Sequence, residues 1–462
     1  MKSRLPRPAQ MAIVLIGIGF LAIMLWELPV AGRSAIARLA DDSQSLDKAK
    51  LDQFFDRLAE KNKAMGSLVI AKDGDVLYTR VIGFGQIDGV ERKPLTPASR
   101  FRIASITKTY TAVMILQLVE EGKLKLTDPL DRFFPQIPNA QRITIGQLLA
   151  HRSGIPDVRR DQATWQPGAP VARDEMLAQI VKDTPDFEPD SRQAYSNAGY
   201  FVLGLILEQA TGKSYAEALE ERITSKIGLK DTYFATSSID VSRNECLTYW
   251  NIGGEWQPGR ESQPSVFEIV STPGDMAEFV KALFELRLIS QQSLDQMKTI
   301  RDGEGLGIVT FTFAGKTFYG NTGGGDNYGS WLAYEPEEKL AVAYTTNAKV
   351  YPVASIISGV VDICCNRPFE IPALESIVVS PEILDKYVGA YSVADVTAKA
   401  IISRDGSTLF FQPPGESTSV ALEATSDDQF QIEGVAVFTF DSANGRLTVK
   451  RRRGERIFTK VK

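Results

Sequence analysis

Ser105 and Lys108 stand three positions apart, a spacing that brings two side chains to one face of a helix. Residues 112–119 are apolar nearly all round, which predicts a buried helix, and Gly122 predicts its end. The helix dipole and partial burial both disfavour the charged form of Lys108, so it could take a proton from Ser105. The free N–H groups at the helix start could stabilise an oxyanion. The alternative is an N-cap serine beside a surface lysine, because S-x-x-K alone is a weak pattern.

The chain has a single histidine, His151, and this count restricts the chemistry. A histidine-rich metal site is excluded, and a Ser-His-Asp enzyme would have to use that one residue. No G-x-S-x-G motif is present either. We therefore expect any serine chemistry to use a base other than histidine.

The composition is that of an ordinary globular protein. Hydrophobic residues make up 44% and charged residues 24% of the 462 positions, which is enough for two or three domains with a large core. The formal net charge of -5 gives no basic surface for nucleic acid, so we expect no nucleic-acid partner.

The first 37 residues are predicted to be an export segment. Lys2, Arg4 and Arg7 precede an apolar run over residues 11–26, and residues 35–37 (Ala-Ile-Ala) resemble a cleavage site. Because the positive residues should stay in the cytoplasm, the rest of the chain is expected to be exported, in the periplasm or another extracytoplasmic space. Residues 1–37 are either a cleaved signal peptide or a membrane anchor in which residues 11–26 tether the protein to the inner membrane. Membrane contact is expected only through this segment.

The order of predicted elements indicates an α/β domain over residues 38–366. A helical pattern over residues 46–63 precedes two strand-like runs, 67–72 and 76–81, joined by Asp73-Gly74, a strong signal for an antiparallel hairpin. Further helices are predicted over 143–151, 200–210, 215–223 and 353–364, and further strands over 307–313, 330–334 and 340–346. We expect an antiparallel sheet whose strands come from both ends of the domain, flanked by helices, with an all-α insertion between them.

The C-terminal part is predicted to be a separate all-β domain. Residues 367–381 form a linker rich in proline, and residues 382–462 contain short alternating runs separated by turn signals. The pattern predicts a small barrel or sandwich. Its basic run over residues 450–453 is either a solvated strand or a surface for anionic envelope polymers.

Two further motifs change the interpretation of Ser105. Tyr195-Ser196-Asn197 precedes the apolar helix predicted from Tyr200, and residues 319–324 (Tyr-Gly-Asn-Thr-Gly-Gly) precede a late strand. With S-x-x-K, the L-L-x-H-x-S-G segment at 148–154 and the stretch 197–215, the chain resembles the serine β-lactamase and penicillin-binding-protein superfamily over residues 45–365. It is most similar to the class C-like branch, which includes DD-peptidases, esterases and D-amino-acid amidases.

The resemblance implies a role for each motif residue. Ser105 would be the acylated nucleophile, Lys108 its proton partner, and Tyr195 the residue that shares the base role and protonates the leaving group. Asn197 would hold Lys108 and the acyl amide of the substrate. The oxyanion hole would be formed by the backbone N–H groups of Ser105 and Gly324. The resemblance implies no metal and no organic cofactor, a structural His151, and a lipocalin-like C-terminal domain.

One position departs from the family pattern. Where the family has K-T-G or H-x-G, this chain has Asn321-Thr322-Gly323, which we expect to contact substrate together with Asn197. Asparagine carries no positive charge, so it can neither attract a substrate carboxylate nor return a proton. Turnover of β-lactams and of D-Ala peptides is therefore not expected to be efficient.

Together these observations predict an exported serine hydrolase that cleaves an amide or ester of a small molecule or peptide through an acyl-enzyme. The alternative is a catalytically degenerate envelope protein that binds cell-wall fragments or β-lactams without turnover. Asn321 favours the alternative, whereas intact Ser105, Lys108 and Tyr195 oppose it. A metal-dependent hydrolase is the least favoured interpretation because the chain has one histidine.

Overall fold

The computed structural model describes most of the chain beyond its N-terminal segment. The described residues are 46–157, 172–235, 238–252, 254–259, 267–325, 327–374, 377–393, 396–414, 419–432, 436–451 and 454–461. The predicted export segment, residues 1–37, therefore lies outside the described residues. Within them, no helix is both long and apolar enough to cross a membrane.

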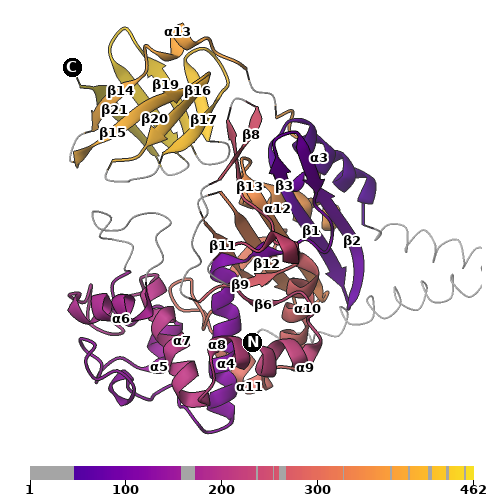
Figure 1. Cartoon of the computed structure of the whole chain (residues 1–462), viewed down its shortest axis with the longest axis vertical. Coiled ribbons are helices and arrows are strands. Elements are labelled where there is room, and N and C mark those ends of the chain that lie inside the picture. The colour runs from indigo at the N-terminus through magenta and orange to yellow at the C-terminus, as the bar shows by residue number, and fades with distance from the viewer. Residues whose placement is uncertain are drawn as a thin grey trace, which may run out of the picture. The chain divides into compact units, whose positions relative to one another are not determined.

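A six-stranded sheet with the order β10-β11-β12-β13-β1-β2 forms the centre of the first domain (Figure 1). Its strands are β1 (Ala64–Lys72), β2 (Asp75–Ile82), β10 (Val309–Phe313), β11 (Lys316–Gly324), β12 (Gly329–Glu335) and β13 (Leu340–Lys349). All neighbouring strands are antiparallel, and β1 pairs with β13, which joins the two ends of the domain. The expected sheet architecture, with strands from both ends of the domain, is confirmed.

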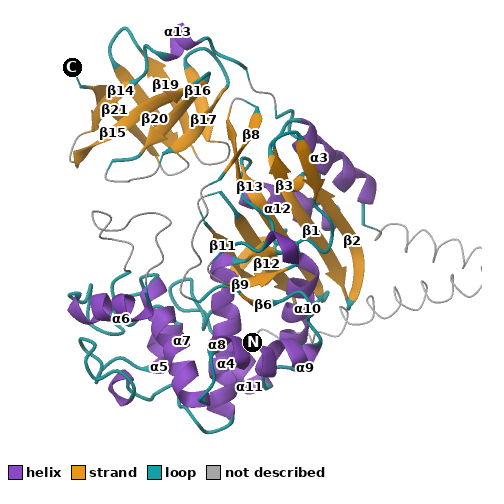
Figure 2. Ribbon diagram, viewed as in Figure 1, coloured by secondary structure: helices purple, strands orange, loops and turns teal. Residues whose placement is uncertain are grey.

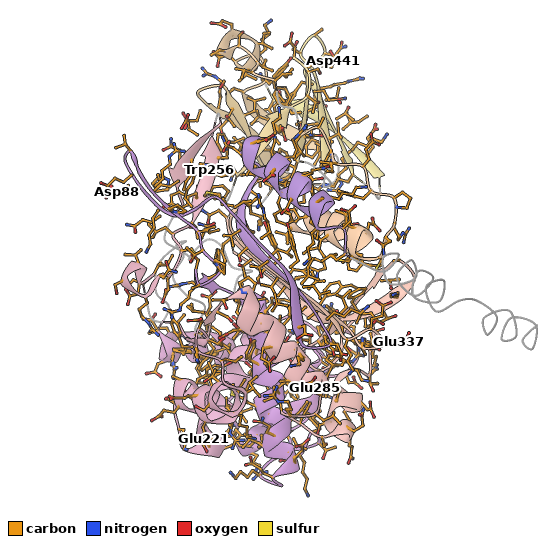
Figure 3. The ribbon with its side chains drawn as sticks, turned by 90° about the vertical axis from the view of Figure 1, so that its right-hand side faces the viewer. Asp88, Glu221, Trp256, Glu285, Glu337 and Asp441 are labelled. Atoms are coloured by element: carbon orange, nitrogen blue, oxygen red, sulfur yellow. The ribbon has the colours of Figure 1, made fainter. Side chains whose placement is uncertain are left out.

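The predicted hairpin is present at the start of this sheet. Asp73 and Gly74 connect β1 to β2 with φ angles of 51° and 97°, the left-handed region that glycine and aspartate tolerate best. Shorter strands lie outside the sheet: β3 (Phe84–Asp88), β4 (Glu91–Pro94), β5 (Phe101–Arg102), β6 (Tyr233–Phe234), β7 (Tyr249–Ile252), β8 (Glu255–Pro258) and β9 (Ile269–Ser271). Figure 3 labels Asp88 at the end of β3 and Trp256 on β8.

Helices cover both faces of the sheet (Figure 2). Ala343 of β13 belongs to the same buried cluster as Phe279 of α10 (Pro273–Phe284). The ring of the next residue, Tyr344, lies 6.3 Å from that of Phe55 on α3 (Lys48–Glu60). Because adjacent residues of a strand point to opposite faces, α10 and α3 cover opposite sides of the sheet. Helix α12 (Val353–Cys364) packs beside α3.

The segment between β5 and β10 is largely helical, as the sequence predicts (Figure 1), but it is not all-α, because the short strands β6 to β9 also belong to it. It contains α4 (Thr107–Glu120), α5 (Ile145–Leu149), α6 (Arg173–Lys182), α7 (Asn197–Thr211), α8 (Tyr215–Leu219), α9 (Ser225–Ile227) and α11 (Gln291–Met297), with a π-helical turn at Glu220–Thr224. Helix α4 is buried almost all round and contacts α7 and α8. It is therefore a rigid support for any residue at its N-terminus.

Strands β14 to β21 close into an antiparallel barrel at the C-terminus. The strands are β14 (Gly389–Val393), β15 (Val396–Asp405), β16 (Thr408–Gln412), β17 (Val420–Ala424), β18 (Gln429–Ile432), β19 (Ala436–Asp441), β20 (Arg446–Arg451) and β21 (Gly454–Lys460), preceded by α13 (Pro381–Leu384). Apolar side chains such as Phe411, Phe438 and Phe458 fill a buried cluster of the barrel's own residues. Of the two predicted architectures, the chain forms the barrel.

Candidate active site

Ser105 lies in a tight turn that the surrounding structure holds in place. The turn is a short 3-10 helix, Ala104–Ile106, directly before α4, so Ser105 precedes the α-helix instead of starting it. Ala104 has a φ of 46°, an unfavourable conformation for a residue with a Cβ. The hydroxyl of Ser330 donates to the carbonyl oxygen of Ile103 at 2.7 Å and fixes the entry to the turn.

Lys108 occupies the first turn of α4 and points at the serine. Its Nζ donates to Ser105 Oγ at 3.1 Å and to Asn197 Oδ1 at 2.8 Å. The residue is 8% exposed, and its Nζ lies 4.8 Å from the ring centroid of Tyr195 and 5.7 Å from that of Tyr200. The lysine head group is therefore enclosed by two hydrogen-bond acceptors and two aromatic faces.

Tyr195 and Asn197 reach the same point from the start of α7. The hydroxyl of Tyr195 lies 2.6 Å from Ser105 Oγ, and either oxygen can be the donor. Ser196 caps α7 by accepting from the N–H of Gly199 at 3.1 Å, so Asn197 is the first residue of the helix, three positions before the predicted start. Tyr195 is 42% exposed, which leaves its hydroxyl accessible from solvent.

His151 is hydrogen-bonded to the backbone on both sides of Tyr195. Its Nδ1 accepts from the N–H of Ser196 at 3.1 Å, and its carbonyl oxygen accepts from the N–H of Ala194 at 2.9 Å. The imidazole lies 4.5 Å from the ring of Tyr195 and 4.9 Å from that of Tyr200. Burial, and next the charge of Lys108, lower the pKa of His151 to about 3, so the ring is neutral near pH 7.

The Asn-Thr-Gly-Gly residues precede the predicted late strand, which is β12, and they themselves form the end of β11, a strand that the sequence did not predict. The ladder between β10 and β11 ends at Gly320, while β12 continues to pair with residues up to Gly324. A Cβ at Gly323 would lie 2.2 Å from the carbonyl oxygen of Ile103 and 3.1 Å from the Cβ of Ala104. Only glycine permits this approach, which brings the end of β11 against the turn that carries Ser105.

Asn321 is turned toward the start of α4. Its Nδ2 donates to Thr109 Oγ1 and to the carbonyl oxygen of Gly307, both at 3.3 Å, and its Oδ1 accepts from the N–H of Thr322 at 2.9 Å. Asn321 therefore links β11 to α4 one residue beyond Lys108. These contacts occupy both ends of its carboxamide.

Glu304 is a residue near the site that sequence reasoning missed. Burial raises the pKa of its carboxyl to about 7, and the charge of Lys108 opposes the shift. The nearby Gly307 accepts a 2.8 Å hydrogen bond from Thr109 Oγ1, so this loop is attached to the start of α4. No motif marks Glu304 in the sequence. The hydrogen bond that attaches its loop to α4 joins Gly307 and Thr109, which are nearly two hundred positions apart.

The geometry forms one connected network. Ser105, Lys108, Tyr195 and Asn197 are joined by hydrogen bonds of 2.6 to 3.1 Å. A proton leaving Ser105 Oγ could pass to Tyr195 Oη if that oxygen is a phenolate, or to Lys108 Nζ if that nitrogen is neutral, without any atom moving far. Among the described residues, no cluster of His, Cys, Asp and Glu side chains could hold a metal ion.

The chain belongs to the beta-lactamase family, because residues 51–356 match that family's description. A penicillin-binding protein of Bacillus subtilis (strain 168) is 26% identical over 424 residues, which cover 84% of this chain and 92% of that protein. The D-alanyl-D-alanine-carboxypeptidase/endopeptidase AmpH of Escherichia coli (strain K12) is 26% identical over 369 residues, covering 70% and 91% of the two chains.

Solved structures agree with this assignment. The octameric penicillin-binding protein homologue from Pyrococcus abyssi superposes with a TM-score of 0.62 at 25% identity, covering 89% of this chain and all of that one. The D-amino acid amidase from Ochrobactrum anthropi SV3 gives a TM-score of 0.60 at 26% identity, covering 69% of this chain and 99% of the amidase. The resemblance inferred from the motifs is therefore confirmed at the level of family and fold.

Proposed function

We propose that the protein is a serine hydrolase that cleaves an amide or ester through an acyl-enzyme. The observation that carries this proposal is the position of Ser105 Oγ, 2.6 Å from Tyr195 Oη and 3.1 Å from Lys108 Nζ. A serine hydroxyl is a weak nucleophile until a neighbouring base takes its proton, and here two candidate bases contact it. Relatives in the same family are a carboxypeptidase and an amidase, which supports hydrolysis of an acyl bond.

In the proposed reaction, Tyr195 starts as a phenolate beside the ammonium of Lys108, and Ser105 Oγ attacks the substrate carbonyl while its proton moves to the phenolate oxygen. Tyr195 then gives the proton to the leaving group as the carbonyl–heteroatom bond breaks. The N–H groups of Ser105 and Gly324 would stabilise the oxyanion, and Asn197, Thr322 and Gly323 would line the bound substrate. A water molecule attacks the acyl-enzyme by the reverse proton path, which releases the acid and restores Ser105.

For the substrate, we propose a small molecule or peptide with a neutral group where related enzymes bind a carboxylate. Asn321 has no charge, and its Nδ2 is engaged with Thr109 and Gly307. A lost charge-assisted hydrogen bond reduces acylation by roughly ten- to a hundredfold. A neutral ester does not need that bond, so esters should be preferred over penicillins and D-Ala peptides.

We also propose export to the periplasm or another extracytoplasmic space, with residues 1–37 as signal peptide or anchor. The basic start, the apolar run over residues 11–26 and the small residues at 35–37 support this proposal. Any association with the cell envelope would follow from that location.

The test is kcat/KM for p-nitrophenyl acetate and for nitrocefin in the wild type, in Ser105→Ala and in Asn321→His, after thermal unfolding has shown that each variant folds. We expect the wild type to prefer the ester, Ser105→Ala to lose both activities, and Asn321→His to gain with nitrocefin alone. Equal changes with both substrates would contradict the carboxylate argument. Nitrocefin binding by a wild type that turns over no substrate would instead support a degenerate binding protein.

A further inference from the structure

The carboxamide of Asn197 is held at both ends by groups of opposite hydrogen-bonding character. Its Oδ1 accepts from Lys108 Nζ at 2.8 Å. Its Nδ2 donates to Asp157 Oδ2 at 3.1 Å. Asp157 follows the Ser153-Gly154 segment, outside the residues assigned above to catalysis or binding.

These two partners allow only one orientation of the amide. A carboxylate offers acceptors only, and an ammonium group offers donors only. Turning the Asn197 carboxamide by 180° would place its NH2 against the ammonium of Lys108 and its oxygen against the carboxylate of Asp157. Both contacts would be repulsive, so Asp157 keeps the amide oxygen directed at Lys108.

We propose that Asp157 is a positioning residue that acts through Asn197 to hold Lys108 against Ser105. The inference rests on the proposed function, since it assigns a further residue to that site. A donor such as lysine, or an apolar side chain, at position 157 would remove one of the two contacts that fix the orientation of the Asn197 amide. The carboxylate of Asp157 thereby helps to fix the amide oxygen that accepts from Lys108.

The rest of the segment over residues 151–157 is anchored to the same part of the chain. His151 accepts backbone N–H bonds from Ala194 and Ser196, and Arg152 Nε donates to Asp190 Oδ1 at 2.6 Å. With the Asp157 contact, the segment is therefore tied at both ends to residues between Asp190 and Asn197. Asp157 Oδ1 is buried and has no hydrogen-bond partner among the described residues, whereas its Oδ2 accepts from Asn197.

A double-mutant cycle separates positioning from general structural support. The proteins are the wild type, Asp157→Ala, Asn197→Ala and the double variant, assayed for kinact and KI with a fluorophosphonate probe. We expect Asp157→Ala to lower kinact by about ten- to a hundredfold with KI unchanged, because one charge-assisted hydrogen bond is lost. In the Asn197→Ala background the same substitution should have little further effect, since contacting residues that act as one unit are not additive. Additive losses, or an unchanged kinact in Asp157→Ala, would overturn the inference.

Two matched variants complete the test. Asp157→Asn retains an oxygen acceptor for Asn197 and should recover most of the activity lost in Asp157→Ala. Asp183→Ala removes a carboxylate whose contact is with Gln179 on α6, and it should react like the wild type. If Asp157→Asn is as slow as Asp157→Ala, the amide orientation is not what Asp157 supplies.

A crystal structure of Asp157→Ala tests the inference without relying on turnover. We expect the Asn197 carboxamide to have turned or moved away from Lys108 Nζ. If Oδ1 keeps its 2.8 Å contact, Asp157 does not position it and the inference fails, even if the variant reacts slowly. Absence of probe labelling in the wild type would instead count against the proposed hydrolase, and the crystal structure would still decide the role of Asp157.

Discussion

At the scale of single residues, two groups compete for the proton of Ser105. Tyr195 Oη is the nearer at 2.6 Å, and Lys108 Nζ is the more enclosed, with Tyr195 and Tyr200 against it. The shorter contact favours a Tyr195 phenolate as the direct acceptor, with the ammonium of Lys108 stabilising the phenolate before it takes the proton. The roles of Tyr195 and Lys108 can be separated by experiment, because replacing Tyr195 by phenylalanine removes only the hydroxyl oxygen.

The variant Tyr195→Phe loses the proton-transferring hydroxyl and keeps the ring that packs on His151. We expect acylation to slow by roughly a hundredfold, the usual contribution of a positioned acid or base, with unchanged thermal stability. The measurement is the single-turnover acylation rate with a reactive ester. An unchanged rate would mean that Lys108 acts alone and that Tyr195 only positions it.

His151 links the site to stability through pH. Its pKa is about 3 in the folded protein against an ordinary value of 6.5, so the unfolded chain binds more protons between these pH values. The stability conferred by the neutral ring is therefore complete above pH 6.5 and is lost as the pH falls. Between pH 6.5 and pH 5 the free energy of unfolding should drop by about 2 kcal/mol from this group.

The variant His151→Asn isolates that contribution because its Oδ1 can replace Nδ1 as acceptor for Ser196, and asparagine tolerates the φ of 54° at this position. We expect a smaller pH dependence of unfolding than in the wild type. Glu304 titrates with the opposite sign, its raised pKa removing stability as the pH rises toward 7, but it is common to both proteins. Identical pH profiles would show that His151 is not buried as a neutral ring. His151→Gln, which places its amide farther from the backbone, should be less stable than His151→Asn.

At the scale of elements, the site depends on β11 lying against the turn of Ser105. Gly323 allows this because its missing Cβ would lie 2.2 Å from the Ile103 carbonyl oxygen. We expect Gly323→Ala to destabilise the protein by about 1 to 3 kcal/mol and to reduce labelling of Ser105 by at least about tenfold. Gly274→Ala in α10 is the control, since its Cβ would meet only Thr272 Oγ1 at 3.7 Å. Equal behaviour of the two variants in thermal unfolding and labelling would refute the close-approach argument.

The elements themselves were largely predictable from local patterns. Hairpin β1–β2, helix α12 and the barrel strands follow from period, turn dipeptides and alternation, which depend on neighbours in the sequence. The 3-10 turn at Ala104–Ile106 was not predicted, because the unfavourable φ of Ala104 is imposed by contacts with Ser330 and β11. Strand β11 was missed for a similar reason, since glycines lower strand propensity and only pairing with β12 makes that segment extended.

Among the residues of the candidate site, only those that belong to a sequence motif could be predicted. Ser105, Lys108, Tyr195 and Asn197 were found from their patterns, and their side chains meet in the fold. Asp157 was missed because its partner Asn197 lies forty positions further along the chain. Long-range hydrogen bonds leave no periodic signal, so no reading of the local sequence could have paired these two residues.

At the scale of the whole molecule, the chain has separate hydrophobic cores. The barrel cluster consists of residues from Val379 to Phe458, and the cluster that contains α4 ends at Ala343. A chain truncated after Glu370 should therefore fold and react with the fluorophosphonate probe. Loss of a cooperative unfolding transition would show that the barrel is required for folding.

The position of the truncation matters because of Phe369. Its ring lies 5.0 Å from that of Phe54 on α3, so a chain ending at Glu370 keeps this contact. Ending the chain at Asn366 removes Phe369 and should lower the free energy of unfolding by roughly 1 to 2 kcal/mol relative to the longer truncation. Equal stability of the two truncated chains would mean that Phe369 contributes nothing to the domain.

The most direct test of the proposed chemistry is the site of covalent modification. The full-length protein would be incubated with a fluorophosphonate, and the modified peptide would be mapped by mass spectrometry in the wild type and in Ser105→Ala. Because Ser105 alone among the site residues contacts both Tyr195 and Lys108, we predict one adduct per chain on Ser105 and none in the variant. Labelling on Ser153, or equal labelling of wild type and variant, would contradict the assignment of Ser105 as nucleophile.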